Sequence, residues 1–163
     1  MTDRDRIGAW WRAHIGARDS SAARALAARL NRGEGVDVLA ERAVYDLAAS
    51  LHLVSDPARL VPLVQILAAV REDRGGPLPR RMGQGDTPAL SPLRFQRLLR
   101  AEGAELATLI RRALPIVDRA CDVGALGADI LHWTDATRAR WAFSYFGAAP
   151  PAALTPSPEE TQA

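Results

Sequence analysis

Apolar residues recur along most of the chain at three- and four-residue intervals, the spacing that buries one face of an α-helix. The alternation of Val, Ile, Thr and Tyr with polar residues that is typical of strands is almost absent. The pattern therefore predicts an all-α protein. We expect helices at residues 3–15, 22–31, 38–53 and 57–73, then at 91–103, from about 104, and after a cap at Asp135 up to Gly147.

Glycine and proline divide this pattern into parts. The segment RGGPLPRRMGQGDTPAL, residues 74–90, is the clearest break in the helical periodicity. We expect two small helical bundles, an N-terminal lobe at residues 1–73 and a C-terminal lobe at 91–147, with 74–90 as a linker. Residues 148–163 have the composition of a disordered tail.

One predicted helix combines an apolar face with a row of arginines. Ser91 is a suitable N-cap and a proline follows it at the first helical position. Its apolar residues are expected to form a buried face; they are Leu93, Phe95, Leu98 and Leu99. Arg94, Arg97 and Arg100 recur every third residue, so they trace a stripe that turns slowly around the helix.

The basic charge is concentrated in the same part of the chain. All 21 basic residues are arginine, and the formal net charge of the whole chain is only +2. Residues 80–112 hold 7 arginines against 3 acidic residues, a net charge of +4. A focused basic surface is expected of a protein that binds nucleic acid.

No catalytic or metal-binding constellation is present in the sequence. The three histidines lie far apart and have no ligand spacing with a cysteine or carboxylate. Cys121 is expected to be a small buried hydrophobe, and a single cysteine without a disulfide partner favours a reducing cytoplasm. We expect no enzyme and no cofactor. The N-terminal segment predicts an amphipathic helix rather than a signal peptide, and no apolar run is long enough to span a membrane.

The aromatic residues favour packing over base stacking. Trp141 falls on an apolar helix seam with Tyr145, and Trp133 continues the apolar stripe of Leu126 and Ile130.

The arginines fall into two groups according to their acidic neighbours in the sequence. Six arginines have acidic residues nearby and are expected to form surface ion pairs: Arg4, Arg6, Arg18, Arg42, Arg71 and Arg74. Five have few acidic neighbours and are candidates for phosphate contact: Arg94, Arg97, Arg100, Arg111 and Arg112.

An ordered set of motifs resembles one known family. PLPRRMGQG, LSPLRFQRLLRA, LIRRALPIV, LGADILHW and RARWAFSYFG follow one another at short spacings, after an N-terminal WWRAHIG. Together they resemble the CasB family, the small subunit of the type I-E CRISPR surveillance complex called Cascade. The resemblance covers roughly residues 8–147.

The resemblance implies an all-helical, two-lobed protein with no cofactor and no catalytic activity. It implies that two copies sit side by side in the complex, against the backbone subunits that hold the CRISPR RNA and with the large subunit as a further partner. The expected role is to stabilise the R-loop, in which guide RNA pairs with one strand of target DNA and displaces the other. Because base pairing reads the sequence there, the protein needs only a positive surface for nucleic-acid backbones.

The resemblance also implies particular contact residues. Arg94 and Arg100 match basic positions of the family's LSxxRFxxLLRA helix, Arg111 and Arg112 match its arginine pair, and Arg138 lies in the basic turn before the last helix. The family's R-A-x-L-R-R run corresponds here to residues 24–29, RALAAR, which lacks the central pair of arginines. The first lobe therefore retains Arg24, Arg29 and Arg59 as candidates.

Two other classes of protein stay open. A sequence-specific helical DNA-binding regulator needs base-reading residues on a recognition helix, and the basic helix offers only Gln96. A purely architectural helical scaffold would use its arginines in ion pairs with neighbouring subunits instead.

Overall fold

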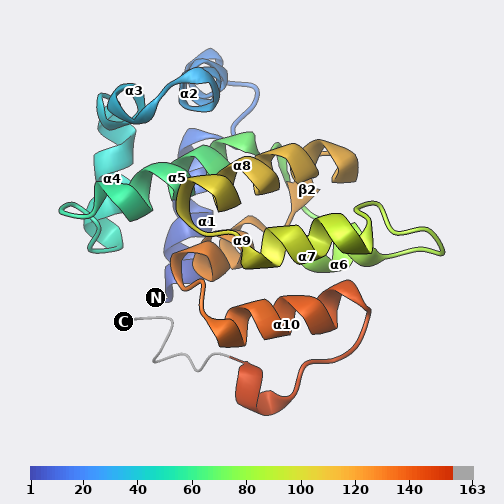
Figure 1. Ribbon diagram of the computed structural model, residues 1–163. Coiled ribbons are helices and arrows are strands. Elements are labelled where there is room, and N and C mark those ends of the chain that lie inside the picture. The colour runs from blue at the N-terminus through green and yellow to red at the C-terminus, as the bar shows by residue number, and fades with distance from the viewer. Residues whose placement is uncertain (156–163) are drawn as a thin grey trace.

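A computed structural model describes residues 1–155, and it confirms the all-α prediction (Figure 1). One pair of two-residue strands accompanies the helices, with Glu72 opposite Ala120 in a parallel register. The α-helices are α1 (Asp3–His14), α2 (Ser21–Arg32), α3 (Gly35–Leu39), α4 (Arg42–Ser50), α5 (Pro57–Ala69), α6 (Leu78–Gly83), α7 (Pro92–Arg100), α8 (Gly103–Ala113), α9 (Val123–Leu131) and α10 (Asp135–Tyr145). The remaining elements are β1 (Glu72–Asp73), β2 (Ala120–Cys121) and the 3₁₀ turns η1 (Leu114–Val117) and η2 (Ala152–Leu154).

Side-chain caps set several helix starts. The Thr2 hydroxyl accepts a hydrogen bond from the Asp5 N–H at 3.2 Å, and the Asp5 carboxylate accepts one from the Thr2 N–H at 3.1 Å. These two bonds satisfy amides that the helix itself leaves free. The last helix differs from the prediction. Thr134 rather than Asp135 is its N-cap, because the Thr134 hydroxyl accepts from the Thr137 N–H.

Three predicted helices were too long, and the one expected at 91–103 ends at Arg100, after which Ala101 is extended. The single helix expected at 38–53 is two short helices, α3 and α4, with Glu41 in extended conformation between them as the N-cap of α4. The helix expected to reach residue 73 ends at Ala69. Val70 is already extended, and the chain enters β1 two residues later. Local apolar periodicity continues through the first break, at Glu41, and as far as Val70 at the second, so it did not reveal them.

The core is built around α5, which packs against α2, α8 and α9, while α1 packs against α9. The buried Leu63 and Leu67 belong to α5, and the Trp11 Nε1–H of α1 donates to the Leu67 carbonyl at 3.0 Å. Helices α1 and α9 approach closely at Gly127, where a Cβ atom would lie 2.6 Å from Ile7 Cγ2. A larger residue at 127 would force these helices apart.

Helices on both sides of residues 74–90 share this core. Residues 74–90 themselves contain α6, whose Leu78 and Met82 are buried and which packs against α10. The buried carboxylate of Asp3 also joins distant parts of the chain, since it contacts Arg6 and the His132 Nε2, each at 3.0 Å. The expected division into two lobes joined by a linker stays a prediction.

The aromatic residues and the cysteine pack as expected. Trp10, Trp11 and Trp141 are buried, and the half-buried Trp133 meets Trp141 edge to face with ring centroids 4.9 Å apart. Cys121 is buried, and burial raises the pKa of its thiol to about 12.

The C-terminal segment continues past α10. The Leu154 carbonyl in η2 accepts from the Arg140 Nε–H at 3.2 Å. The disorder predicted for 148–163 falls in part on residues 156–163, which lie outside the described residues. Among residues 1–155, no helix has the length and apolar character needed to cross a bilayer.

Candidate nucleic-acid interface

Helix α7 presents the first part of the candidate interface. The Ser91 hydroxyl accepts from the Arg94 N–H, and Pro92 stands in the first turn, so the sequence positions this helix as predicted. Phe95 and Leu98 are buried against the core. Leu93 was wrongly predicted to be buried: its side chain is 77% exposed.

This orientation leaves one broad face of α7 exposed. The face contains Leu93, Arg94, Gln96, Arg97 and Arg100. A hollow of about 350 Å³ lies against it and also touches Ala101 and Glu105. The arginine stripe therefore turns around the exposed part of α7 without entering the core, and all three arginines line this hollow.

A narrow crevice between α7 and α8 brings together arginines from both helices. It has a volume of about 100 Å³, and its charged lining residues are Arg94, Arg97 and Arg112. The apolar residues Leu90, Leu98 and Leu109 form the rest of its lining. We call Arg94, Arg97, Arg100 and Arg112 the α7–α8 arginine surface. All four side chains are exposed, and none has an ion-pair partner among residues 1–155.

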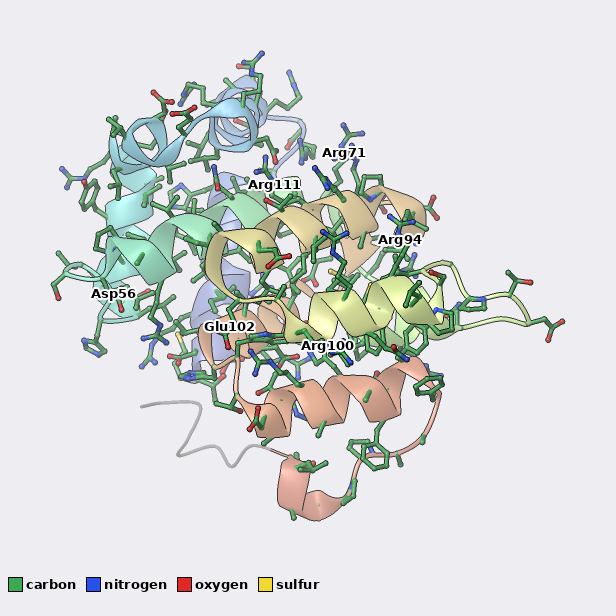
Figure 2. All side chains as sticks on the ribbon, viewed as in Figure 1. Asp56, Arg71, Arg94, Arg100, Glu102 and Arg111 are labelled. Atoms are coloured by element: carbon green, nitrogen blue, oxygen red, sulfur yellow. The ribbon has the colours of Figure 1, made fainter. Side chains whose placement is uncertain are left out.

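Arg111 points to a different place from its neighbour Arg112. Its guanidinium donates to the Asn31 carbonyl at the end of α2. In Figure 2 it lies near Arg71 on the α2 side of α8, whereas Arg94 lies near the start of α7 and Arg100 on the side of α7 that faces α10. Arg111 therefore helps to tie α8 to α2.

A larger hollow of about 530 Å³ lies beyond α8, on the side of Arg111. We call it the arginine hollow; it is lined by Ala28, Asn31, Arg32, Ala69, Arg71, Thr108, Arg111, Arg112 and Arg119. Because Arg112 lines both this hollow and the α7–α8 crevice, the two are adjacent. No acidic residue lines either of them.

Sequence reasoning missed the arginine hollow. Arg32 and Arg119 were not considered as contacts, and Arg71 was expected to pair with a nearby acid. The acids beside it have other partners: Glu72 pairs with Arg74 at 2.5 Å and Asp73 with Arg12 at 3.6 Å. In the described part of the chain, Arg71 has no ion-pair partner.

Some of the other arginines that were expected to form surface ion pairs do so, and others do not. Arg4 pairs with Asp122, and Arg6 pairs with Asp3 at 3.0 Å. The expectation was wrong for Arg18 and Arg42, for which the described residues include no ion pair. The pKa of Arg18 is lowered, chiefly because the guanidinium is partly buried and further because Arg71 and Arg119 are near.

The four remaining candidate arginines are engaged within the protein. Arg29 donates to both carboxylate oxygens of Glu41, at 2.5 and 3.2 Å. Arg24 donates to the Arg18 carbonyl, and Arg59 donates to the Leu131 carbonyl at 2.5 Å.

Arg138 is the fourth. It pairs with Glu102 at 2.8 Å and Asp135 at 3.3 Å, and it lies 5.6 Å from the ring centroid of Trp133. Such internal partners compete with any phosphate for the same guanidinium groups.

The described residues contain no group of three or more His, Cys, Asp or Glu side chains that could hold a metal ion. The charged groups that line the crevice and the arginine hollow are guanidinium groups. Each one is permanently charged and can donate two parallel hydrogen bonds to an oxyanion.

An all-α protein with an arginine-lined surface on α7 and α8 is the class that the fold and the site define. Comparison with models of known families matches residues 13–146 to CRISPR-associated protein Cse2, and the chain belongs to that family. This confirms the resemblance carried by the sequence motifs, because CasB and Cse2 denote the same family, and it makes the chain a subunit of the CRISPR Cascade complex. No curated protein and no solved structure matches the chain.

Proposed function

We propose that this Cascade subunit binds nucleic-acid backbones through the α7–α8 arginine surface and thereby stabilises the R-loop. The observation that carries the proposal is the contiguous set of Arg94, Arg97, Arg100 and Arg112, exposed and without acidic partners among residues 1–155. Elsewhere the protein neutralises many of its arginines internally. These four guanidinium groups are available to phosphate at no cost in broken ion pairs.

The physical demands of an R-loop fit such a surface. Guide RNA reads the target by base pairing, so a protein that holds the strands needs affinity for phosphates without base selectivity. Arginines that face outward from two adjacent helices meet this demand. The apolar lining of the crevice, with Leu90, Leu98 and Leu109, gives the guanidinium groups a surface of low polarity on which attraction to phosphate is less screened.

The further partners are part of the same proposal. They are the CRISPR RNA, the target DNA as displaced strand or as heteroduplex, the backbone and large subunits, and a second copy of this chain. Nucleic-acid contact by Arg24, Arg29, Arg59 and Arg138 stays a prediction. For Arg29, Arg59 and Arg138 it requires that phosphate replace a carboxylate partner.

The test is R-loop formation by a reconstituted Cascade complex that carries Arg94→Ala and Arg112→Ala. We expect the complex to assemble with normal stoichiometry and to form R-loops on target DNA at least about tenfold less well at physiological salt. A matched control carries Arg42→Ala and Arg80→Ala. These change the charge equally on α4 and α6, and neither residue lines the hollow against α7, the α7–α8 crevice or the arginine hollow.

The outcomes separate the proposal from its alternatives. Equal R-loop formation by both variants would contradict it and favour an architectural scaffold. Weakened binding that depends on target sequence, measured on scrambled probes with the isolated protein, would instead favour a sequence-specific regulator.

A further inference from the structure

The arginine hollow has a charge composition that the fold does not explain. Five arginines line it from four separate parts of the chain: Arg32 ends α2, Arg71 precedes β1, Arg111 and Arg112 belong to α8, and Arg119 precedes β2. None of the five forms an ion pair with any residue between 1 and 155. Like charges gathered without a counter-charge repel one another, so this arrangement of arginines is unfavourable by itself.

A sixth arginine adds to this repulsion. Arg18, in the loop between α1 and α2, is half-buried, and its buried Nε has no hydrogen-bond partner in the described structure. Arg71 and Arg119 are close enough to Arg18 to help lower its pKa, after the larger effect of burial. The cluster therefore includes a sixth, partly buried guanidinium group.

The backbone holds two of these arginines together at a further cost. Arg119 has φ = 55° and the preceding Asp118 has φ = 61°, so two consecutive non-glycine residues are left-handed. Such residues each cost about 1 kcal/mol or more and persist where the surroundings fix them, often at functional sites. Here the Arg119 carbonyl accepts from the Arg71 N–H at 2.8 Å, and the Arg119 N–H donates to the Leu114 carbonyl at 2.8 Å.

A phosphate group matches this arrangement. It carries one or two negative charges on oxygens that accept several hydrogen bonds. A single arginine guanidinium can donate two parallel hydrogen bonds to it. A volume of about 530 Å³ leaves room for a sugar beside the phosphate. Direct continuity with the α7–α8 crevice through Arg112 places the hollow at the end of the proposed nucleic-acid surface.

We propose that the arginine hollow is a phosphate-binding site in which Arg32, Arg71, Arg112 and Arg119 grip one phosphate group. The inference deepens the proposed function and rests on it for the source of the phosphate, a nucleic-acid backbone that leaves the α7–α8 surface here. Free phosphate offers the same chemistry, and the experiment distinguishes the two sources.

The experiment measures thermal unfolding of the full chain in sodium phosphate and in sodium chloride of equal ionic strength. Phosphate bound to the native state raises Tm by mass action. We expect a rise of about 4 °C once phosphate exceeds its dissociation constant about tenfold. Pyrophosphate should act at lower concentration. Phosphate also stabilises proteins by exclusion from their surface, so the informative quantity is the difference between variants.

The test variant carries Arg71→Gln and Arg119→Gln, which keep the backbone hydrogen bonds and remove two charges. The control carries Arg42→Gln and Arg80→Gln. We expect both to fold in chloride, and only the test variant to lose the phosphate-specific rise in Tm. An equal rise in wild type and test variant would overturn the proposal, as would no rise beyond chloride in wild type.

A second measurement identifies the source of the phosphate. Affinity for a single-stranded oligonucleotide is measured by fluorescence anisotropy with the same three proteins. A loss of about tenfold confined to the test variant supports backbone phosphate as the ligand. Unchanged affinity together with a lost Tm response assigns the hollow to free phosphate and overturns its place on the nucleic-acid path. Oligonucleotide binding by wild type with no phosphate response overturns the site alone and leaves the proposed function standing.

Discussion

Helix α10 and the α7–α8 surface lie on neighbouring parts of the molecule and use the same residue type in opposite ways (Figure 1). On α10, Arg138 pairs with two carboxylates, and Arg140 pairs with Asp129 at 2.9 Å with both side chains mostly buried. On α7 and α8, Arg94 and Arg112 face solvent with no acidic partner among residues 1–155.

The contrast shows that an arginine's role depends on its partners. The α10 arginines are neutralised within the fold, so their charge stabilises the protein and contributes little to the outside field. The α7–α8 arginines add nothing comparable to stability, and their field extends into solvent where a polyanion can respond to it. Substitutions should therefore separate stability from nucleic-acid affinity.

The largest expected effect is the loss of stability when Asp129 is replaced by Ala. Asp129 accepts from Arg140 at 2.9 Å and from the Trp141 Nε1–H at 2.8 Å. Its removal leaves a mostly buried charge and a donor unpaired, which should lower the free energy of unfolding by about 3 kcal/mol. Chemical denaturation measures this. Asp135→Ala is the control, because that carboxylate is fully exposed and its replacement should lower the free energy of unfolding far less. Equal losses of stability from the two substitutions would contradict the claim that the buried Asp129–Arg140 pair stabilises the fold.

The next largest effect is a loss of nucleic-acid affinity at the α7–α8 arginine surface. Arg97→Glu reverses one charge that lines both the α7 hollow and the α7–α8 crevice. We expect nucleic-acid affinity to fall about tenfold at low salt, while the free energy of unfolding stays within about 0.5 kcal/mol of wild type. Fluorescence anisotropy and denaturation on the same preparation measure both quantities. Arg42→Glu is the charge-matched control. An equal loss of affinity there would mean that binding depends on the net charge of the protein and not on the location of Arg97.

The smallest effect is expected from Glu41→Gln, which converts a paired arginine into a free one. The hydrogen bond from Arg29 lowers the pKa of Glu41, so this carboxylate stabilises the fold above its ordinary pKa of 4.5 and loses that contribution as pH falls through the lowered value. Wild type should therefore be slightly more stable than Glu41→Gln at neutral pH, and the two should converge in acid. Thermal unfolding as a function of pH measures this. A difference in stability that grows in acid would contradict the pairing.

The same substitution should also release Arg29 toward solvent. We expect nucleic-acid affinity to rise by less than about twofold, because one exposed charge is strongly screened. The measurement is anisotropy at low salt. A fall in affinity would show that the Glu41 carboxylate takes part in binding.

The sequence predicted what depends on local chemistry. The helical periodicity, the Ser91–Pro92 start of α7 and the burial of Trp141 all follow from neighbours within one or two turns. The broad location of the basic surface also follows, because charge density along a helix survives folding. Leu93 was misplaced because apolar character does not say which side of a helix meets the core.

What the sequence could not predict are contacts between distant residues. Arg29 meets Glu41 across 12 positions, and Arg71 is joined to Arg119 by the backbone next to the β1–β2 pair. Counting acids near an arginine in sequence gave the wrong result for Arg71, because its neighbours Glu72 and Asp73 pair with other arginines. Two-residue strands have no sequence signature, so the arginine hollow beside them could not be predicted from the sequence.

The most direct test compares the salt dependence of nucleic-acid binding in two triple variants of equal charge. One carries Arg94→Gln, Arg97→Gln and Arg112→Gln; the other carries Arg29→Gln, Arg59→Gln and Arg138→Gln. Each phosphate contact contributes about 0.9 to the slope of log affinity against log salt for duplex DNA. We expect the first variant to flatten the slope by about 2 to 3 and the second by less than about 1. Equal flattening, or an unchanged slope in the first variant, would contradict the claim that the unpaired arginines of α7 and α8 bind the backbone.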